Sequence, residues 1–182
     1  MPGFDAYYWS PADMGLLAET FPIHENATGT ILPTAGRIEC FRLKVPQAGW
    51  CTNVDVSLSA VGATLTAGQN FGALFHRDGT LIAQTTDQSA AWVASTPVLK
   101  NMPLASGPVY LAVGEYYVGV WANGSTLPTF HRSTSFVAAT LNRGAAAPNF
   151  RVCSANTGLT TTAPATLGTQ TATAVSYYFS LS

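Results

Sequence analysis

Paired carboxylates are the side chains in this sequence that could hydrolyse a sugar polymer, since that reaction uses two of them facing each other across a cleft. Among the nine acidic residues, Glu39 and Asp55 are the two that could meet across adjacent strands. Like charges in that arrangement are destabilising unless a cation pairs with them. Because Arg37 and Arg42 are close by in the sequence, we interpret Glu39 and Asp55 as structural residues.

Acyl transfer would need a hydroxyl nucleophile beside a histidine. The segment that comes nearest to this is His131-Arg132-Ser133, but the chain contains no Gly-x-Ser-x-Gly elbow. We therefore expect no catalytic residues and no enzymatic activity.

Metal binding has equally little support. Asp78 and Asp87 could hold calcium together with loop carbonyls, or they could be a turn residue and a loop cap. The three cysteines, Cys40, Cys51 and Cys153, form no Cys-x-x-Cys pair, and we expect three free thiols that act as small core residues. Neither a metal ion nor a cofactor is expected.

Exposed aromatic rings are the remaining candidates for ligand contacts, because a flat ring can stack on a sugar. Most of the tryptophans and tyrosines should lie in the core or in an interface. We expect Trp50 and Tyr178 to be the exposed rings that could bind a glycan.

The first 35 residues differ from the rest of the chain. Four aromatic side chains fall within the first nine residues, a density that is unusual for a disordered tail: Phe4, Tyr7, Tyr8 and Trp9. Two readings stay open for this arm. Its aromatic residues dock onto a partner, or they fold back onto the chain's own body.

A short helix is predicted within the arm. Ser10-Pro11-Ala12-Asp13 places serine at the N-cap, proline at the first helical position and an acid at the third. Met14 and Leu17 give this helix an apolar stripe, and we expect about two turns, too few for stability in isolation.

Alternation of apolar and polar residues dominates from residue 37 onwards and predicts strands with one buried face. Residues 71–75 and 81–85 flank Asp78-Gly79 and predict a β-hairpin. Residues 115–122 are apolar on both faces, which predicts a central strand. We expect Trp92 to be buried against Gly119 of that strand.

An all-β fold follows from this pattern, an antiparallel β-sandwich of the jelly-roll kind preceded by a short arm with a small helix. The division is an N-terminal docking arm over residues 1–35 and a sandwich domain over residues 36–182. Residues 41–45 and 52–58 should be neighbouring strands, and 136–141 a further strand. The uncharged stretch 154–174 is either a surface loop or an edge strand.

Composition excludes several classes of partner. Charged residues make up 9% of the 182 residues and the net charge is -1, against about 25% charged residues in a typical domain. The eight lysines and arginines are scattered through the sequence, so we expect no basic face and no nucleic acid partner. Without an apolar run of spanning length or a secretion signal, we expect neither export nor membrane insertion.

Most of the chain resembles a β-sandwich module found in virion proteins of tailed bacteriophages that infect actinobacteria, often described as minor tail or head-decoration proteins. The resemblance is carried by the N-terminal segment 7–13 and by residues 43–49, 67–75, 78–85, 87–92, 114–119 and 160–165, together with the C-terminal strand. It implies a non-enzymatic component of the virion that forms a symmetric oligomer, which we expect to be a homotrimer. The absence of a secretion signal and the expected free cysteines agree with assembly in the cytoplasm of a host bacterium.

The function expected from the resemblance is that of a capsid decoration protein on the virion surface, docked through its arm onto the major capsid protein. The arm residues expected to dock are Phe4, Tyr7, Tyr8, Trp9, Met14 and Leu17. The alternative is a minor tail protein at the tail tip, in contact with other tail proteins, that serves host adhesion by recognising a surface glycan.

Overall fold

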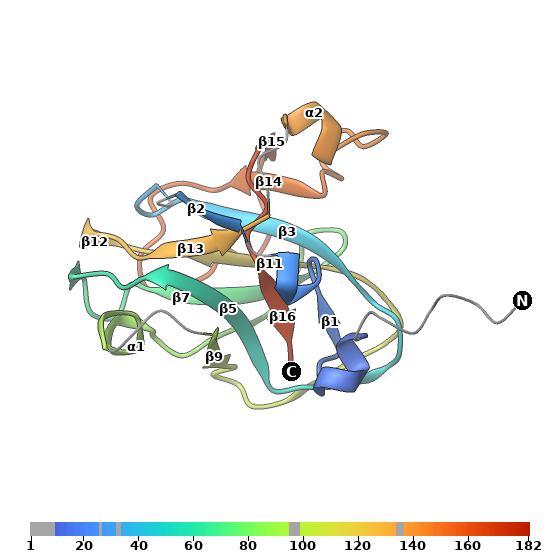
Figure 1. Cartoon of the computed structure of the whole chain (residues 1–182), viewed down its shortest axis with the longest axis horizontal. Coiled ribbons are helices and arrows are strands. Elements are labelled where there is room, and N and C mark those ends of the chain that lie inside the picture. Colours follow the sequence, from blue (N-terminus) through green and yellow to red (C-terminus); the bar gives the residue numbers. More distant parts are fainter. Residues whose placement is uncertain (1–9, 26, 32–33, 95–98, 134–136) are drawn as a thin grey trace, which may run out of the picture.

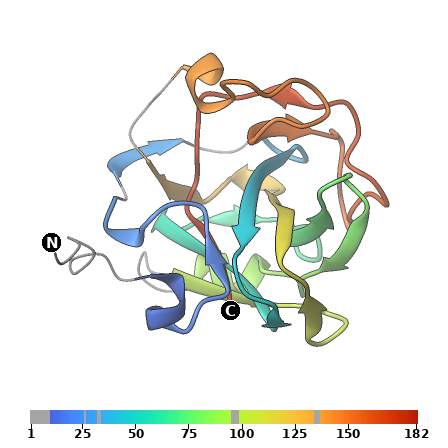
Figure 2. The ribbon, with the colours of Figure 1, turned by 90° about the vertical axis from the view of Figure 1, so that its right-hand side faces the viewer.

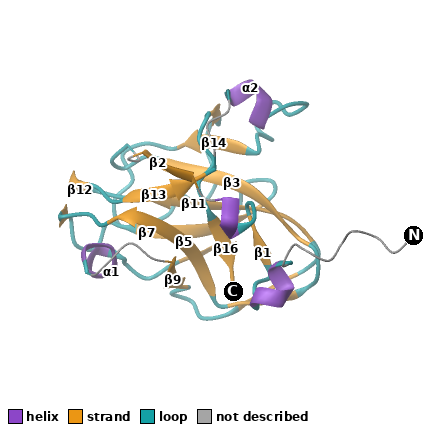
Figure 3. Cartoon of the chain, viewed as in Figure 1, coloured by secondary structure: helices purple, strands orange, loops and turns teal. Residues whose placement is uncertain are grey.

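Alternating apolar residues in the long strands build two antiparallel sheets that pack face to face. The computed structural model describes residues 10–25, 27–31, 34–94, 99–133 and 137–182. Strands are the predominant regular structure of the described chain, and the helices are short elements at its periphery (Figures 1 and 3). The prediction of an all-β sandwich is therefore confirmed.

The first sheet has β5 at its centre and brings the two ends of the described chain together. Its strands, in spatial order, are β1 (Ala18–Glu19), β16 (Phe179–Leu181), β5 (Asn53–Ala60), β13 (Thr129–Arg132) and β2 (Ala27–Ile31). Outside this order, β9 (Leu99–Pro103) also pairs with β5. Every pairing in this sheet is antiparallel.

The second sheet is built around β11. Its spatial order is β15 (Thr171–Ala172), β14 (Val152–Ala155), β3 (Ile38–Val45), β11 (Gly114–Trp121), β7 (Phe71–His76) and β8 (Leu81–Gln84). Two small ribbons complete the strands, β4 (Gly49–Cys51) with β10 (Val109–Leu111), and β6 (Thr64–Leu65) with β12 (Gly124–Thr126). The described helices are η1 (Pro11–Met14), η2 (Ile23–Glu25), α1 (Ser89–Val93) and α2 (Ala138–Leu141).

Two local predictions in the second sheet are confirmed. β7 and β8 form the expected hairpin, where Gly79 has a φ of +91° and the backbone N–H of Thr80 donates to Asp78 Oδ1 at 2.9 Å. β11 lies between β3 and β7 and is almost entirely buried, as a strand apolar on both faces should be.

A row of aromatic rings fills the core between the sheets. Trp92 of α1 contacts Phe130 with ring centroids 5.5 Å apart, Phe130 contacts Tyr177 at 5.8 Å, and Tyr177 contacts Phe41 of the opposite sheet at 5.5 Å. The row ends at Phe179. Edge-to-face contacts of this kind are favourable for ring quadrupoles, so the row connects α1 with both sheets.

The burial predicted for Trp92 is confirmed, but the predicted neighbour is wrong. Gly119 faces the other side of the second sheet, where a Cβ at its position would lie 2.6 Å from Ile38 Cδ1 and 3.3 Å from Cys40 Sγ. Glycine is therefore required at this position for close packing of β3 against β11.

A second apolar cluster lies on that outer side of the second sheet, and the segment after β14 covers it (Figure 2). Trp121 Nε1 donates to the carbonyl of Thr160 at 3.1 Å, and the backbone N–H of Leu81 donates to Ala165 at 2.9 Å. Residues 154–174 thus consist of the end of β14, a long covering loop and the edge strand β15. The threonine-rich loop can lie on the sheet because its backbone groups form hydrogen bonds with neighbouring strands.

Two strand predictions are wrong. Residues 41–45 lie in β3 and residues 53–58 in β5, and these strands belong to different sheets. Between them in the chain lies β4, which pairs with β10 instead of with either strand. The segment 138–141 is the helix α2. The cysteine prediction is confirmed, since all three thiols are free and buried.

The helix start of the arm is confirmed by its capping box, in which the backbone N–H of Asp13 donates to Ser10 Oγ and Asp13 Oδ2 accepts from the backbone N–H of Ser10. The helix is a single 3-10 turn ended by Gly15, shorter than predicted. The later part of the arm enters the sandwich, because Ala18–Glu19 and Ala27–Ile31 are strands of the first sheet.

Candidate functional site

The carboxylates considered for catalysis lie apart. Glu39 belongs to β3 and Asp55 to β5, in opposite sheets, so the two carboxylates do not meet across adjacent strands, as the sequence would have allowed. Arg37 Nε donates to Glu39 Oε1 at 2.8 Å, which is the expected structural pairing. Burial raises the pKa of Glu39, and the hydrogen bond from Arg37 opposes that effect.

A serine and a histidine do meet, in a way the sequence did not indicate. Ser57 Oγ lies 2.8 Å from His131 Nδ1 across β5 and β13. Ser57 is buried within its strand, and burial lowers the pKa of His131. Within the described ranges no carboxylate hydrogen bonds to His131, so this pair lacks the group that orients the base in a catalytic triad.

Asp78 and Asp87 have the structural roles that were weighed against calcium binding. Asp78 closes the β7–β8 turn, and Asp87 Oδ1 accepts from the backbone N–H of Asn70 at 3.0 Å and from Ser89 Oγ at 2.9 Å. In the part of the chain that the structure describes, no three His, Cys, Asp or Glu side chains gather as metal ligands would.

Tyr178 is wrongly predicted as an exposed ring, because it is completely buried. Phe21 packs edge-on against it with centroids 5.6 Å apart, and Tyr178 Oη donates to Glu19 at 3.2 Å. The alternation of the last strand correctly turns Tyr178 away from the main core. The segment that covers this face comes from the arm, about 160 residues away in sequence.

Trp50 is exposed as predicted, and it has an aromatic partner. Trp50 and Tyr110 lie opposite each other on β4 and β10, with ring centroids 5.4 Å apart in an edge-to-face contact. The two residues are 64% and 60% exposed. Two large rings left in water side by side are uncommon on a surface that has no binding role.

The exposed rings stand at the base of the arm. A groove of about 460 Å³ runs between η1 and the turn before β4, and its lining includes Leu16, Pro46 and Trp50. Leu17 fixes η1 against this turn, since its Cδ2 would lie 2.6 Å from a Cβ at Gly49. We call the exposed residues of this end, Met14, Trp50, Tyr110 and Val113, the docking face.

The arm residues divide into two groups. Phe4, Tyr7, Tyr8 and Trp9 lie outside the described residues. Met14 is exposed on η1, and Leu17 is half-buried against the main core. The docking face therefore lies next to the point at which the aromatic segment joins the described chain.

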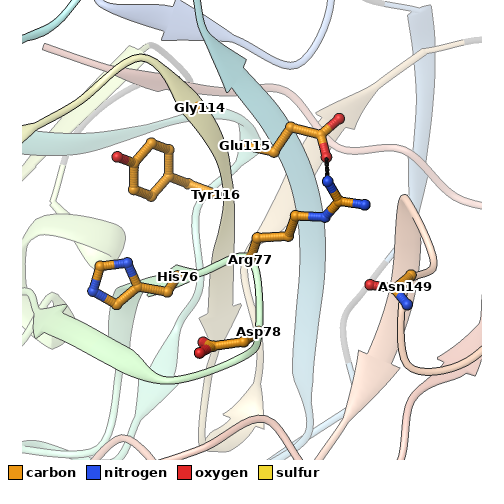
Figure 4. Close-up of a pocket in the computed structure, with 7 residues that line it drawn as sticks. All are labelled: His76, Arg77, Asp78, Gly114, Glu115, Tyr116 and Asn149. Atoms are coloured by element: carbon orange, nitrogen blue, oxygen red, sulfur yellow. Dashed lines mark ion pairs between the residues drawn. The ribbon is translucent and has the colours of Figure 1, made fainter.

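A polar pocket opens at the turn of the β7–β8 hairpin. It measures about 430 Å³ and is lined by His76, Arg77, Asp78, Gly114, Glu115, Tyr116 and Asn149. Figure 4 shows Arg77 reaching toward Glu115, with the rings of His76 and Tyr116 on one side and Asn149 on the other. Arg77 Nη1 lies 3.1 Å from Glu115 Oε2.

Several cations that are far apart in the sequence lie near this pocket. Arg42 Nη1 lies 3.9 Å from the same Glu115 oxygen, and Lys44 is directly opposite Glu115 across β3 and β11. Arg151 donates to the carbonyl of Arg143 in the adjoining loop. The fold thus gathers at one end of the second sheet residues that are far apart in sequence, and no local motif signals it.

Comparisons of the chain with protein-family models and with curated protein sequences find no match. None of the described helices has the length and apolar character needed to cross a membrane. The functional assignment therefore rests on the two surfaces described above, the docking face and the pocket at the hairpin turn.

Proposed function

We propose that this protein is a non-enzymatic structural component of a bacteriophage virion, a capsid decoration protein that attaches through its arm and the docking face. The observation that carries the proposal is the exposed pair Trp50 and Tyr110 at the base of the arm. Tryptophan and tyrosine are the residues most enriched at the energetic centres of protein interfaces.

The low charge around the docking face also supports its role as an interface. Among residues 10–17, 45–51 and 109–113, Asp13 is the one charged side chain, and the capping box with Ser10 occupies it. An interface centre is typically depleted of charge in this way. The aromatic residues of the preceding arm segment would extend the apolar contact onto the partner.

Binding to purified capsids that lack this protein tests the proposal. We expect the double variant Trp50→Ser with Tyr110→Ser to reduce affinity at least a hundredfold, because hot-spot rings contribute about 2 kcal/mol or more each. Deletion of residues 2–9 should abolish co-sedimentation with the particles. The deletion stops short of β1 and so leaves the sheet strands in place.

Two exposed valines provide a matched control. Val113→Ser lies on the docking face and should weaken capsid binding, whereas Val137→Ser, at the start of α2, should not, although the two residues are 61% and 67% exposed. Unchanged capsid binding by the deletion and by the double variant would rule out the proposal.

A tail-tip module that recognises a host-surface glycan is the second candidate. The same exposed ring pair favours it, because adjacent rings can stack on a sugar. With Tyr178 buried, the sugar contact moves to Trp50 and Tyr110. On an array of host cell-wall glycans we expect binding that Trp50→Ala and Tyr110→Ala each abolish. Absence of glycan binding together with retained capsid binding would assign the surface to assembly.

A further inference from the structure

The outer face of the second sheet changes character along its length. Near Gly119 it is apolar and covered by residues 156–170, as described above. At the opposite end of β3 and β11, the same face presents Arg42, Lys44 and Glu115, and Arg77 extends over it from the end of β7. Two arginines thus share one carboxylate, with Lys44 opposite it in the sheet, in a protein whose net charge is -1.

Arg42 is the most unusual member of this group. Its side chain is 10% exposed, yet its one ion pair is the 3.9 Å contact with Glu115, a long distance for a charge-assisted hydrogen bond. None of the described residues accepts a hydrogen bond from its guanidinium group. A guanidinium has five N–H donors, and nearby acceptors for them are favourable at a side chain that is so little exposed. An anion next to Arg42 would supply them.

The space beside Arg42 is a second pocket, which we call the basic pocket. It measures about 310 Å³ and is lined by Arg42, Arg77, Gly144, Ala145, Ala146, Ala147 and Asn149. The lining contains two guanidinium groups, one amide and a wall of small residues, and no carboxylate. The basic pocket shares Arg77 and Asn149 with the neighbouring pocket at the hairpin turn.

The wall opposite the arginines is held in place by a buried amide. Asn142 Oδ1 accepts from the backbone N–H groups of Arg151 and Val152 at 2.7 and 3.0 Å, and its Nδ2 donates to the Val152 carbonyl. The backbone N–H of Asn149 donates to Ala146 at 2.7 Å. These bonds tie the loop to β14, so the basic pocket is formed before a ligand arrives.

We propose that the basic pocket binds the carboxylate or phosphate group of a sugar-sized molecule, with Arg42 and Arg77 as the anion ligands and Asn149 as a polar contact. Planar guanidinium groups match the geometry of both anions. The pocket volume lies at the lower end of the range for small-ligand sites, larger than a lone inorganic anion requires. Glu115 holds both arginines near one oxygen and competes with the ligand for them.

Titration of the full chain with glucuronate, glucose 6-phosphate, inorganic phosphate and glucose tests this site. Calorimetry should detect at least one of the two sugar anions, bound more tightly than inorganic phosphate, and glucose should not bind. In amide NMR spectra the shifts should centre on residues 77 and 144–149, away from residue 50. The preferred sugar anion distinguishes a carboxylate ligand from a phosphate ligand.

Three substitutions should change the affinity for the sugar anion in three different ways. Arg77→Gln should weaken binding about tenfold, because one charge-assisted bidentate contact is lost. Glu115→Gln should tighten binding several-fold by removing the competing carboxylate, a change that a purely structural ion-pair cluster would not produce. Lys100→Gln removes a positive charge from β9 in the other sheet and should change the affinity less than twofold.

Failure to bind either sugar anion below about 10 mM, or equal effects of Arg77→Gln and Lys100→Gln, would overturn the proposal. Inorganic phosphate binding as tightly as glucose 6-phosphate would mean an adventitious ion only. Because Arg77 and Glu115 lie outside the docking face, both variants should keep capsid binding, so this site and the proposed function can fail separately.

Discussion

Replacement of Trp92 by alanine should lower the free energy of unfolding by about 3–5 kcal/mol, the usual loss for a fully buried tryptophan. Its ring is completely buried and forms one end of the aromatic row through Phe130, Tyr177 and Phe41. The alanine variant keeps the backbone hydrogen bond in which the Trp92 carbonyl accepts from the N–H of Gly62 at 2.9 Å, so the expected loss comes from the side chain. Loss of the ring opens a cavity between α1 and the first sheet, which this short helix cannot close.

Urea denaturation followed by far-ultraviolet circular dichroism measures the effect. Trp50→Ala is the matched control, because it deletes the same side chain from an exposed position and should change stability by less than about 0.5 kcal/mol. Trp92→Phe keeps most of the ring packing and removes an indole N–H that has no hydrogen-bond partner among the described residues, so its loss should be smaller. Equal losses for Trp92→Ala and Trp50→Ala would contradict this account of the core.

The elements that local chemistry determines are the ones the sequence predicts well. Asp78-Gly79 specifies its hairpin through a turn that needs a positive φ, and Ser10 with Asp13 specifies a capped turn. The continuous apolar run of β11 indicates a strand buried on both faces, whichever strands pair with it. These predictions need no information about residues distant in the chain.

Predictions that depend on distant partners fail for a common physical reason. A period of two identifies which residues share a face but leaves open what covers that face. Tyr178 points away from the main core, as predicted, yet Phe21 covers it. Gly119 accommodates a neighbour, as predicted, but the neighbour is Ile38 on the adjacent strand rather than Trp92. The strand period gives no sign of either contact.

The candidate sites show the same limit. Trp50 can be chosen as an exposed ring because it follows a turn, but its pairing with Tyr110 requires the register of β4 with β10. Arg42 comes from β3, Glu115 from β11 and Arg77 from the turn after β7, and their meeting follows from the order β3-β11-β7. A count of charges along the sequence therefore describes them as scattered, whereas the sheet brings them together.

A buried carboxylate should make the protein less stable as the pH rises. Asp55 is fully buried in the first sheet, where Ser180 Oγ donates to its Oδ2 at 3.2 Å and its Oδ1 has no hydrogen-bond partner among the described residues. Burial raises the pKa of Asp55 to about 6, against the smaller lowering by the hydroxyls of Ser182 and Ser180. The folded protein therefore holds this proton over a pH range in which the unfolded chain releases it.

The sign of the effect follows from proton linkage. Below pH 3.8, the ordinary pKa of an aspartate, Asp55 is protonated in both the folded and the unfolded state, so it contributes no pH dependence to the free energy of unfolding. Between pH 3.8 and about 6 the unfolded chain ionises first, so stability falls, and above that range the loss is complete. A shift of this size corresponds to about 3 kcal/mol.

Asp55→Asn should abolish this loss, because an amide stays neutral at every pH. Its advantage over the unsubstituted protein in the free energy of unfolding should grow from pH 3 to pH 8 by about 3 kcal/mol. The change in this difference, measured by urea denaturation across the range, cancels any constant effect of exchanging an oxygen for a nitrogen. It also cancels the titration of Glu39, whose raised pKa acts in the same direction in both proteins. A difference that stays constant from pH 3 to pH 8 would show that Asp55 ionises in the folded protein as it does in water, with solvent reaching a side chain that the first sheet encloses.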